Sequence, residues 1–363
     1  MNEQSMVGIL LGPAVYRNIP SGRTGKEQLS WYAETAAEFG LVPCFVQLSG
    51  LVPGRLRVPA YVPDGKGAFR FARVPFPRVI HNRSIHTLPA HVQRLNRLAR
   101  SGIRIFNLHN RYSKWQIHKL LMLDESIRSH LPETAIATPS SIYRLQQNHP
   151  ALILKPVRGS VGRGIMRLAL ASNGKRELLL QRRNGRWYRI CFGKRLPPVL
   201  LRRIRKQSYI VQQYLPLATY EGKPFDLRVS IQKNETGGWQ ITGVAVRVAQ
   251  EGAFLTNVAQ GARVVPLETV LAACPLLDPA QTEEAVSQFA LQVAHQLDRH
   301  LPHLADLGLD IGLTGYGYPL FIEVNGRDQR YSFEEAGLHD TWKQTYRNPM
   351  AYAHFLLTQP KTT

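Results

Sequence analysis

The segments Gly308-Leu309-Asp310-Ile311-Gly312-Leu313 and Phe321-Ile322-Glu323-Val324-Asn325 decide the fold prediction for this chain. The residues between them, 314–319, favour a turn, so the two segments are expected to form a β-hairpin. Alternate residues of a strand share a face, which places Glu323 and Asn325 on one side with Asp310 alongside. Two carboxylates and an amide oxygen are hard ligands and predict a Mg²⁺ platform that leaves positions open for phosphate. The plainer alternative is a surface hairpin with solvated acids.

Length and composition indicate a folded protein of two or three packed units. The chain has 363 residues, a mass of 41.0 kDa and 44% hydrophobic residues. No apolar run reaches the roughly 18 residues that a bilayer span needs. The first five residues carry an acid and no basic region, which argues against a secretory signal. The widely spaced Cys44, Cys191 and Cys274 are expected to be reduced thiols, so the predicted location is the cytoplasm.

The charge of the chain points to anionic partners. Lys and Arg (46) exceed Asp and Glu (25), giving a formal charge of +21 and a pI near 10.2. Segment 175–206 holds many of these cations and one acid, Glu177, with aromatic residues interleaved. Such interleaving is typical of nucleic-acid binders. Because the aromatic side chains could equally pack inward, an anionic small molecule or peptide is favoured over nucleic acid.

The first third of the chain alternates strands with helices, which predicts a small α/β domain with a parallel sheet over residues 1–107. Ligands of such sheets bind at the carboxyl ends of strands, so Asn82 and Arg83 are candidate anion contacts. Residues 50–78, rich in Pro, Gly and Arg, are expected to be irregular. The remaining elements are predicted as strands at 6–12, 41–46, 78–83 and 103–106 and helices at 26–40 and 88–101.

Residues 108–363 are predicted to form a second domain, with a lid subdomain at about 140–212. An amphipathic helix should start after Ser113, whose side chain can cap it. Residues 132–142 are expected to be a connection in which Thr138-Pro139 breaks helical structure.

A glycine-rich loop at 158–164 lies between two predicted strands, 152–156 and 165–168. A loop between two strands is a hairpin, unlike the strand-to-helix turn of a Walker or Rossmann site. Its glycines allow backbone N–H groups to approach phosphate, and Lys155 would place an ammonium group near the same phosphates. The alternative is an ordinary turn.

Three further strands carry polar side chains at positions that suit a nucleotide site. The strand 209–215 carries the Gln212-Gln213 doublet. The strand 225–231 alternates so that Asp226, Arg228 and Ser230 share a face, from which an arginine can bind a phosphoryl or carboxylate group with two N–H donors. A strand at 243–249 leads to a turn that presents Asn257.

The order of these motifs resembles the ATP-grasp superfamily, and more narrowly the YheC/YheD family associated with endospore coats. The narrower resemblance covers nearly the whole chain. It is carried by Lys114-Trp115, Ile153-Leu154-Lys155-Pro156 with its loop, Ile210-Val211-Gln212-Gln213, Pro224-Phe225-Asp226-Leu227-Arg228, Arg247-Val248-Ala249, Thr256-Asn257 and Phe321-Ile322-Glu323-Val324-Asn325.

The resemblance implies an ATP-grasp fold of the α/β (α+β) class, preceded by a small parallel-sheet domain. It also implies ATP and one or two Mg²⁺ ions as cofactors. For the nucleotide, the resemblance implies that Lys114 and Lys155 bind the α- and β-phosphates, that Gly159, Ser160, Gly162 and Gly164 form a lid over the triphosphate, and that Asn257 lies at the nucleotide site. Gln213 and Leu215 would contact adenine through their backbone, and Glu221 would contact ribose. Asp310, Glu323 and Asn325 would bind Mg²⁺, and Arg228 and Lys155 would be the catalytic residues that neutralise the transferred γ-phosphoryl group.

The chain departs from the family pattern in two places. Many relatives continue past Glu-x-Asn to a proline, whereas this chain reads Gly326-Arg327-Asp328-Gln329-Arg330. Residues beyond this strand often face the acceptor substrate in the superfamily, so the resemblance makes Arg327 and Arg330 candidates for binding an acid, although the family gives no direct match there. Arg163 adds a charge to a loop that is usually less basic.

The resemblance implies an enzyme that activates a carboxylate as an acyl phosphate, which an amine or thiol then attacks. The expected substrate is anionic and peptide-like, the expected location is cytoplasmic or spore-associated, and a homodimer is compatible with the sequence. Two alternatives remain open. One is a kinase with the same ATP site, and the other is a spore-coat or polyanion-binding protein without turnover.

Overall fold

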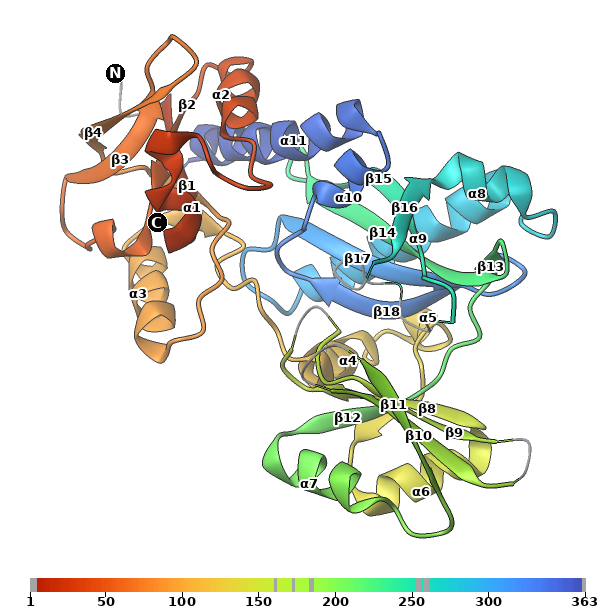
Figure 1. The fold of residues 1–363 in the computed structure, drawn as a ribbon. Helices are drawn as coiled ribbons and strands as arrows, with labels where there is room; N and C mark the ends of the chain where they lie inside the picture. The colour runs from red at the N-terminus through yellow and green to blue at the C-terminus, as the bar shows by residue number, and fades with distance from the viewer. Residues whose placement is uncertain are drawn as a thin grey trace.

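The computed structural model describes residues 5–159, 162–171, 174–182, 186–252, 256 and 261–360. The predicted site residues Ser160 and Asn257 lie outside this part of the chain. Within it, the strands form three sheets that follow one another along the sequence (Figure 1). No helix in these ranges is both long enough and apolar enough to span a membrane.

The first sheet has the order β4-β3-β2-β1-β5-β6, and its strands β2, β1, β5 and β6 run parallel. This confirms the predicted strand–helix–strand pattern. Helix α2 covers the sheet through the buried Leu29, Tyr32 and Ala36, which recur at helical spacing. The elements are β1 (Met6–Leu10), α1 (Pro13–Arg17), η2 (Ile19–Ser21), α2 (Leu29–Ala37), β2 (Val42–Val46), η3 (Leu48–Gly50), β3 (Arg57–Pro63), β4 (Phe69–Pro75), β5 (Val79–Asn82), α3 (Pro89–Arg100) and β6 (Arg104–Phe106).

The prediction of an irregular segment at 50–78 is wrong, because β3 and β4 form an antiparallel hairpin at the edge of this sheet. Prolines suggested irregular structure, but edge strands tolerate residues that lack an N–H donor. The usable signal was alternation, since Val58, Ala60 and Val62 are buried while their neighbours are not.

The second sheet, β11-β10-β9-β8-β12-β7, is antiparallel throughout and carries α6 and α7 on one face (Figure 1). The predicted hairpin around the glycine-rich loop is confirmed as β8–β9. Thr138-Pro139 starts helix α6 instead of breaking it, because Thr138 caps the helix and proline suits its first turn. The elements are β7 (Thr134–Ile136), α6 (Pro139–Asn148), β8 (Ala151–Pro156), β9 (Met166–Leu170), β10 (Arg176–Gln181), β11 (Trp187–Phe192), α7 (Pro198–Lys206) and β12 (Tyr209–Gln213).

The third sheet, β16-β15-β14-β17-β18 with β13 attached to β14, lies between helices on both faces (Figure 1). Helix α9 and the short helix α4 bury one face, and α10 and α11 cover the other. Ser113 caps α4 as predicted, accepting a hydrogen bond from the Gln116 N–H at 3.0 Å. The elements are α4 (Lys114–Leu121), α5 (Glu125–Arg128), β13 (Thr219–Tyr220), β14 (Lys223–Lys233), β15 (Trp239–Val248), β16 (Arg263–Pro266), α8 (Leu267–Ala273), α9 (Pro279–Asp298), β17 (Asp306–Leu313), β18 (Pro319–Asn325), α10 (Tyr331–Glu335) and α11 (His339–Thr358).

Strand parity places charged side chains on one face of the third sheet. The apolar residues of β14 pack toward α9, so Asp226, Arg228 and Ser230 share the opposite face, as predicted. The β17–β18 hairpin is also confirmed, and its register places Asp310 directly opposite Glu323. Acids and arginines of three neighbouring strands are thereby brought together on a buried surface.

The last helix returns to the beginning of the chain. In Figure 1, α11 lies beside α2, and a single apolar cluster contains Val7 and Tyr32 together with Trp342, Tyr346 and Met350. The boundary between 1–107 and 108–363 stays a prediction. The shared core does mean that the first and third sheets are joined by apolar packing.

Candidate functional site

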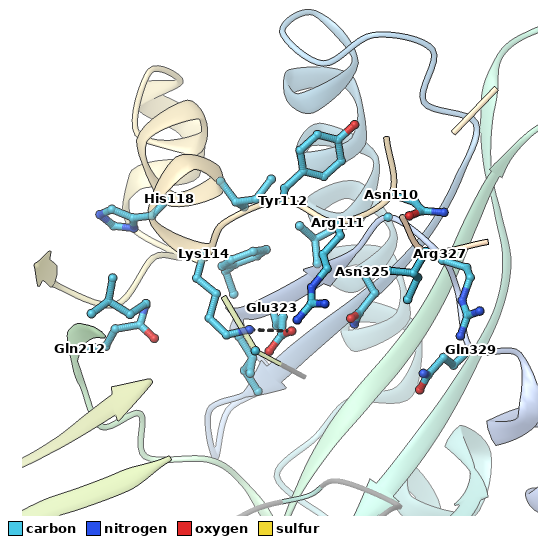
Figure 2. A pocket seen from close by; sticks show the side chains of 18 residues that line it. Asn110, Arg111, Tyr112, Lys114, His118, Gln212, Glu323, Asn325, Arg327 and Gln329 are labelled. Atoms are coloured by element: carbon cyan, nitrogen blue, oxygen red, sulfur yellow. Dashed lines mark ion pairs between the residues drawn. The ribbon is translucent and has the colours of Figure 1, made fainter. Parts of the chain in front are cut away.

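A pocket lies where α4, the second sheet and the end of β18 meet. Its volume of about 120 Å³ is below the roughly 300–1,000 Å³ of typical ligand sites. The polar residues that line it include Asn110, Arg111, Lys114, His118, Gln212, Glu323, Asn325, Arg327 and Gln329, most of them visible in Figure 2.

Lys114 and Glu323 close this pocket with an ion pair of 2.8 Å between Nζ and Oε1 (Figure 2). Lys114 is the first residue of α4, and its backbone N–H donates to the Val157 carbonyl at the end of β8. Glu323 and Asn325 reach the pocket from the same face of β18. The structure therefore brings together three side chains for which the sequence predicted nucleotide or metal contact.

Lys155 stands beside these groups on β8. Burial lowers the pKa of its ammonium group to about 8, with Lys114 acting in the same direction and Glu323 and Asp310 opposing. No carboxylate of the described residues lies within ion-pair distance of it, which leaves its charge available to a phosphate. This placement fits the predicted phosphate contact.

Two of the described glycines of the loop 158–164 have the left-handed conformation that favours glycine. Gly162 and Gly164 have positive φ angles of 66° and 78°, and the Gly164 carbonyl accepts a hydrogen bond from the Tyr209 hydroxyl at 3.1 Å. Gly159 lines the pocket, whereas Gly162 and Gly164 do not. Arg163 is exposed, as a solvated side chain would be.

The side chain of Gln213, one of the two predicted adenine residues, points away from the pocket. Gln212 and Ile210 line the pocket, and neighbouring residues of a strand face opposite sides, so the Gln213 side chain faces Glu133. The Gln213 N–H also donates to the Glu133 carbonyl at 2.9 Å. A backbone role for Gln213 and Leu215 stays a prediction. The alternation of side chains along β12 therefore makes Gln212, and not Gln213, the polar side chain that faces the pocket.

Glu221 lies away from this pocket. It forms an exposed ion pair with Arg263 at 2.9 Å and lines a separate hollow beside β16. The structure does not bring the predicted ribose contact into the pocket, because β13 and β14 carry it to another edge of the third sheet.

Asp310 is held by two arginines. Arg228 Nη2 lies 3.0 Å from its Oδ1, and Arg247 Nη2 lies 2.9 Å from its Oδ2. Arg247 also binds Asp226 through two hydrogen bonds of 2.7 Å. Burial works to raise the pKa of the Asp310 carboxyl, but Arg228 and Arg247 overcome it and hold this pKa below the ordinary value.

Arg228 also approaches Asp328, with 3.3 Å between Nη1 and Oδ1. A Cβ atom at Gly308 would come within 2.5 Å of the Asp328 carboxylate and 2.6 Å of Arg228, so both side chains would have to shift for any larger residue there. Since Arg228 is held between Asp310 and Asp328, its predicted contact with a phosphoryl group requires it to leave at least one of them.

The predicted metal ligands fit Mg²⁺ in part. Glu323 and Asn325 are oxygen donors that face the pocket, which suits a hard cation. Both Asp310 oxygens are within ion-pair distance of arginine, so this carboxylate becomes a ligand only after Arg228 or Arg247 moves. Across the described ranges, no group of three or more His, Cys, Asp or Glu side chains is arranged to hold a metal ion.

A second buried cluster, centred on Asp306, was not predicted. Its Oδ2 accepts from Arg330 at 2.8 Å and lies 3.2 Å from His81 Nε2 and 3.3 Å from Arg83 Nη1. Asn107, at a positive φ of 52°, binds the backbone N–H and C=O groups of Asp306. The alternation Asp306, Gly308, Asp310 was the available signal, because it places Asp306 on the polar face of β17.

The overall fold is similar to that of solved ATP-grasp ligases. The ATP-grasp ligase PsnB, complexed with a phosphomimetic precursor variant, Mg and ADP, matches with a TM-score of 0.53 and 15% identity over 98% of this chain and 99% of PsnB. D-alanyl-alanine synthetase A from Vibrio cholerae matches with a TM-score of 0.52 and 16% identity over 96% of this chain and 99% of that one. The fold is therefore that of an ATP-grasp protein.

Within this fold, the chain can be assigned to a particular family. A family model described as YheC/D like ATP-grasp matches residues 102–356, and the chain belongs to that family, as the sequence motifs indicated. The endospore coat-associated protein YheC of Bacillus subtilis (strain 168) is 24% identical over 90% of this chain and 91% of its own length. Its counterpart YheD is 28% identical over 68% of this chain and 54% of its own length, so the chain spans about half of YheD.

Proposed function

We propose that this chain is an ATP- and Mg²⁺-dependent ligase that joins a carboxylate to an amine. The supporting observation is the group formed by Lys114, Glu323 and Asn325 in the pocket, with Lys155 beside it. Two ammonium groups suit the phosphates of ATP, and the oxygen donors of β18 suit a divalent cation. Solved proteins of the same fold, PsnB and D-alanyl-alanine synthetase A, carry ligase or synthetase in their names.

In the proposed reaction, a carboxylate oxygen of the acid forms a bond to the γ-phosphorus of ATP while the bond to the β,γ-bridging oxygen breaks. ADP leaves with that electron pair, and an acyl phosphate remains. The amine nitrogen then bonds to the carbonyl carbon, phosphate leaves, and the nitrogen loses a proton. Lys114 and Lys155 bind and orient the phosphates, and Arg228 offsets charge on the transferred group.

Glu323 and Asn325 would hold Mg²⁺, which offsets phosphate charge as the group transfers. The glycine-rich loop would exclude water, because water would hydrolyse an acyl phosphate. The Lys114–Glu323 ion pair has to open for both partners to be used, since the ammonium group then turns to phosphate and the carboxylate to the cation.

The test is calorimetric titration of a non-hydrolysable ATP analogue into the protein, with and without Mg²⁺. We expect Mg²⁺-dependent binding that Glu323→Ala weakens at least tenfold, while Glu125→Gln, on the exposed surface of α5, leaves affinity unchanged. Absence of binding to the unmodified chain in either condition would refute the proposal.

A polyanion-binding role without turnover is the second candidate. It is favoured by the exposed cations of the second sheet and α7, which include Arg182, Arg189, Lys194, Arg195, Arg202, Arg205 and Lys206. Binding of poly-glutamate that weakens steeply with salt, in a protein that does not bind the ATP analogue, would favour it over the ligase.

A further inference from the structure

A second pocket, of about 270 Å³, lies next to the one just described. It is formed at the carboxyl ends of β1 and β5 by the loop 24–27, by Arg83, by Arg327 and by residues 329–331. Arg327 and Gln329 line both pockets, so a molecule bound here would lie beside the proposed ATP site. The carboxyl ends of parallel strands are the usual place for ligands in such sheets.

Three of the cations in the second pocket are already paired. Arg83 binds Glu27 at 2.8 Å, Arg330 binds Asp306 at 2.8 Å, and Lys26 binds Glu334 at 2.7 Å. Arg83 and Arg330 are buried and held in the fold by these pairs, whereas the pair of Lys26 is exposed and contributes little.

Arg327 is different. Its Nη1 donates to the Arg83 carbonyl at 3.2 Å, but no carboxylate within the described residues lies within ion-pair distance. The remaining N–H groups of its planar fork suit a carboxylate or another planar anion.

Glu27 provides the opposite charge. Its Oε1 accepts both hydrogen bonds from Arg83, at 3.2 and 2.8 Å, whereas its Oε2 is buried with no hydrogen-bond partner. An unpartnered buried carboxylate oxygen is costly. Glu27 lines the pocket, so a turn of its carboxylate would bring Oε2 to the pocket wall, where an ammonium group would satisfy it.

We propose that the second pocket binds a small zwitterion, that is, a free amino acid or a similar molecule. Arg327 holds its carboxylate, and Oε2 of Glu27 accepts a hydrogen bond from its ammonium group. This assignment rests on the proposed ligase function and identifies the class of one of the two substrates. A pocket of this size has room for a molecule much larger than one water.

The test titrates the protein, saturated with the ATP analogue and Mg²⁺, with the twenty common L-amino acids, D-alanine and β-alanine. Each zwitterion that binds is compared with two analogues of the same carbon skeleton, one without the ammonium group and one without the carboxylate. We expect at least one zwitterion to bind and each analogue to bind at least tenfold more weakly.

Two variants assign the contacts. Arg327→Gln should weaken zwitterion binding at least tenfold. Glu27→Gln should do the same while the ATP analogue binds within twofold of its original affinity, because Glu27 lies outside the first pocket. Melting temperatures are measured in parallel to show that both variants are folded. The comparison of zwitterions with their analogues uses the unmodified protein, so it tests the proposal even if a variant does not fold.

Nucleotide binding without any zwitterion binding up to 10 mM would overturn this proposal alone. Equal affinity for the analogue without the ammonium group would also overturn it, because the pocket would then be a simple anion site. Loss of nucleotide binding in the unmodified protein would instead count against the proposed ligase.

Discussion

Replacement of Lys155 by methionine should stabilise the protein while it removes a phosphate contact. Burial lowers the pKa of Lys155 from an ordinary value of 10.5 to about 8, and each tenfold change in the proton equilibrium is worth about 1.4 kcal/mol. The charged form therefore costs about 3 kcal/mol at neutral pH. Because part of the side chain reaches solvent, screening reduces this cost to about 1–2 kcal/mol.

The direction in which stability changes with pH follows from proton binding by Lys155. Between pH 8 and 10.5 the unfolded chain binds the proton of Lys155 more tightly than the folded chain, so the stability of the unmodified protein rises with pH in that interval. Lys155→Met should thus raise the unfolding free energy by about 1–2 kcal/mol below pH 8, and the gain should vanish by about pH 10.5.

Urea unfolding at pH 7, 8, 9 and 10 measures this effect, and titration of the ATP analogue measures the functional loss, which we expect to be at least tenfold. Lys114→Met is the matched control. It removes the other ammonium group but leaves Glu323 without its partner at 2.8 Å, so it should not stabilise. A Lys155→Met protein that is less stable than the original at pH 7, or a gain that is independent of pH, would refute the reasoning.

Three further predictions concern the buried polar face. Gly308→Ala should lower the unfolding free energy measured with urea by about 1–3 kcal/mol, because its Cβ would clash with Arg228 and Asp328. The control Gly315→Ala, whose Cβ would have nothing within 4 Å, should be nearly neutral. Equal losses of stability in the two variants would contradict this. Asn107→Ala should cost about 3 kcal/mol by the same measurement, since it removes the side-chain partners of two N–H groups and two carbonyls; a loss below 1 kcal/mol would argue against it. Burial lowers the pKa of His81 to about 4, so stability should fall as pH drops from about 6.5 to 4, and His81→Gln should flatten that slope; an unchanged slope would exclude His81 as its source.

Local patterns were sufficient to predict most of the site-bearing elements. The β17–β18 hairpin, the shared face of Asp226 and Arg228, and the cap at Ser113 each depend on residues within a few positions of one another. Such features follow from strand parity and helix-end chemistry. The order of the motifs then identified the fold and the family.

Other features depend on long-range contacts that no local pattern reveals. Asp306 meets Arg83 across 223 residues, and Arg330 meets Tyr32 across 298. For the same reason the sequence predicted Asp310 as a free metal ligand, whereas Arg247, two strands away in the third sheet, forms an ion pair with it. The hairpin β3–β4 is hidden for a different reason, because the Pro, Gly and Arg content of residues 50–78 indicates irregular structure although edge strands tolerate proline.

The second sheet enters and leaves the rest of the molecule at one point, where the Gln213 N–H meets the Glu133 carbonyl at 2.9 Å. Its apolar core is drawn entirely from residues 135–211. A segment whose ends meet in this way can be lengthened, shortened or exchanged with little displacement of the chain on either side. Much of the exposed positive charge lies within this exchangeable segment, whereas Glu323 and Asn325 lie outside it. The surface charge of this segment can therefore change during evolution while Glu323 and Asn325 stay in place, provided that Lys155, Gly159 and Ile210, which the segment contributes to the first pocket and its surroundings, are kept.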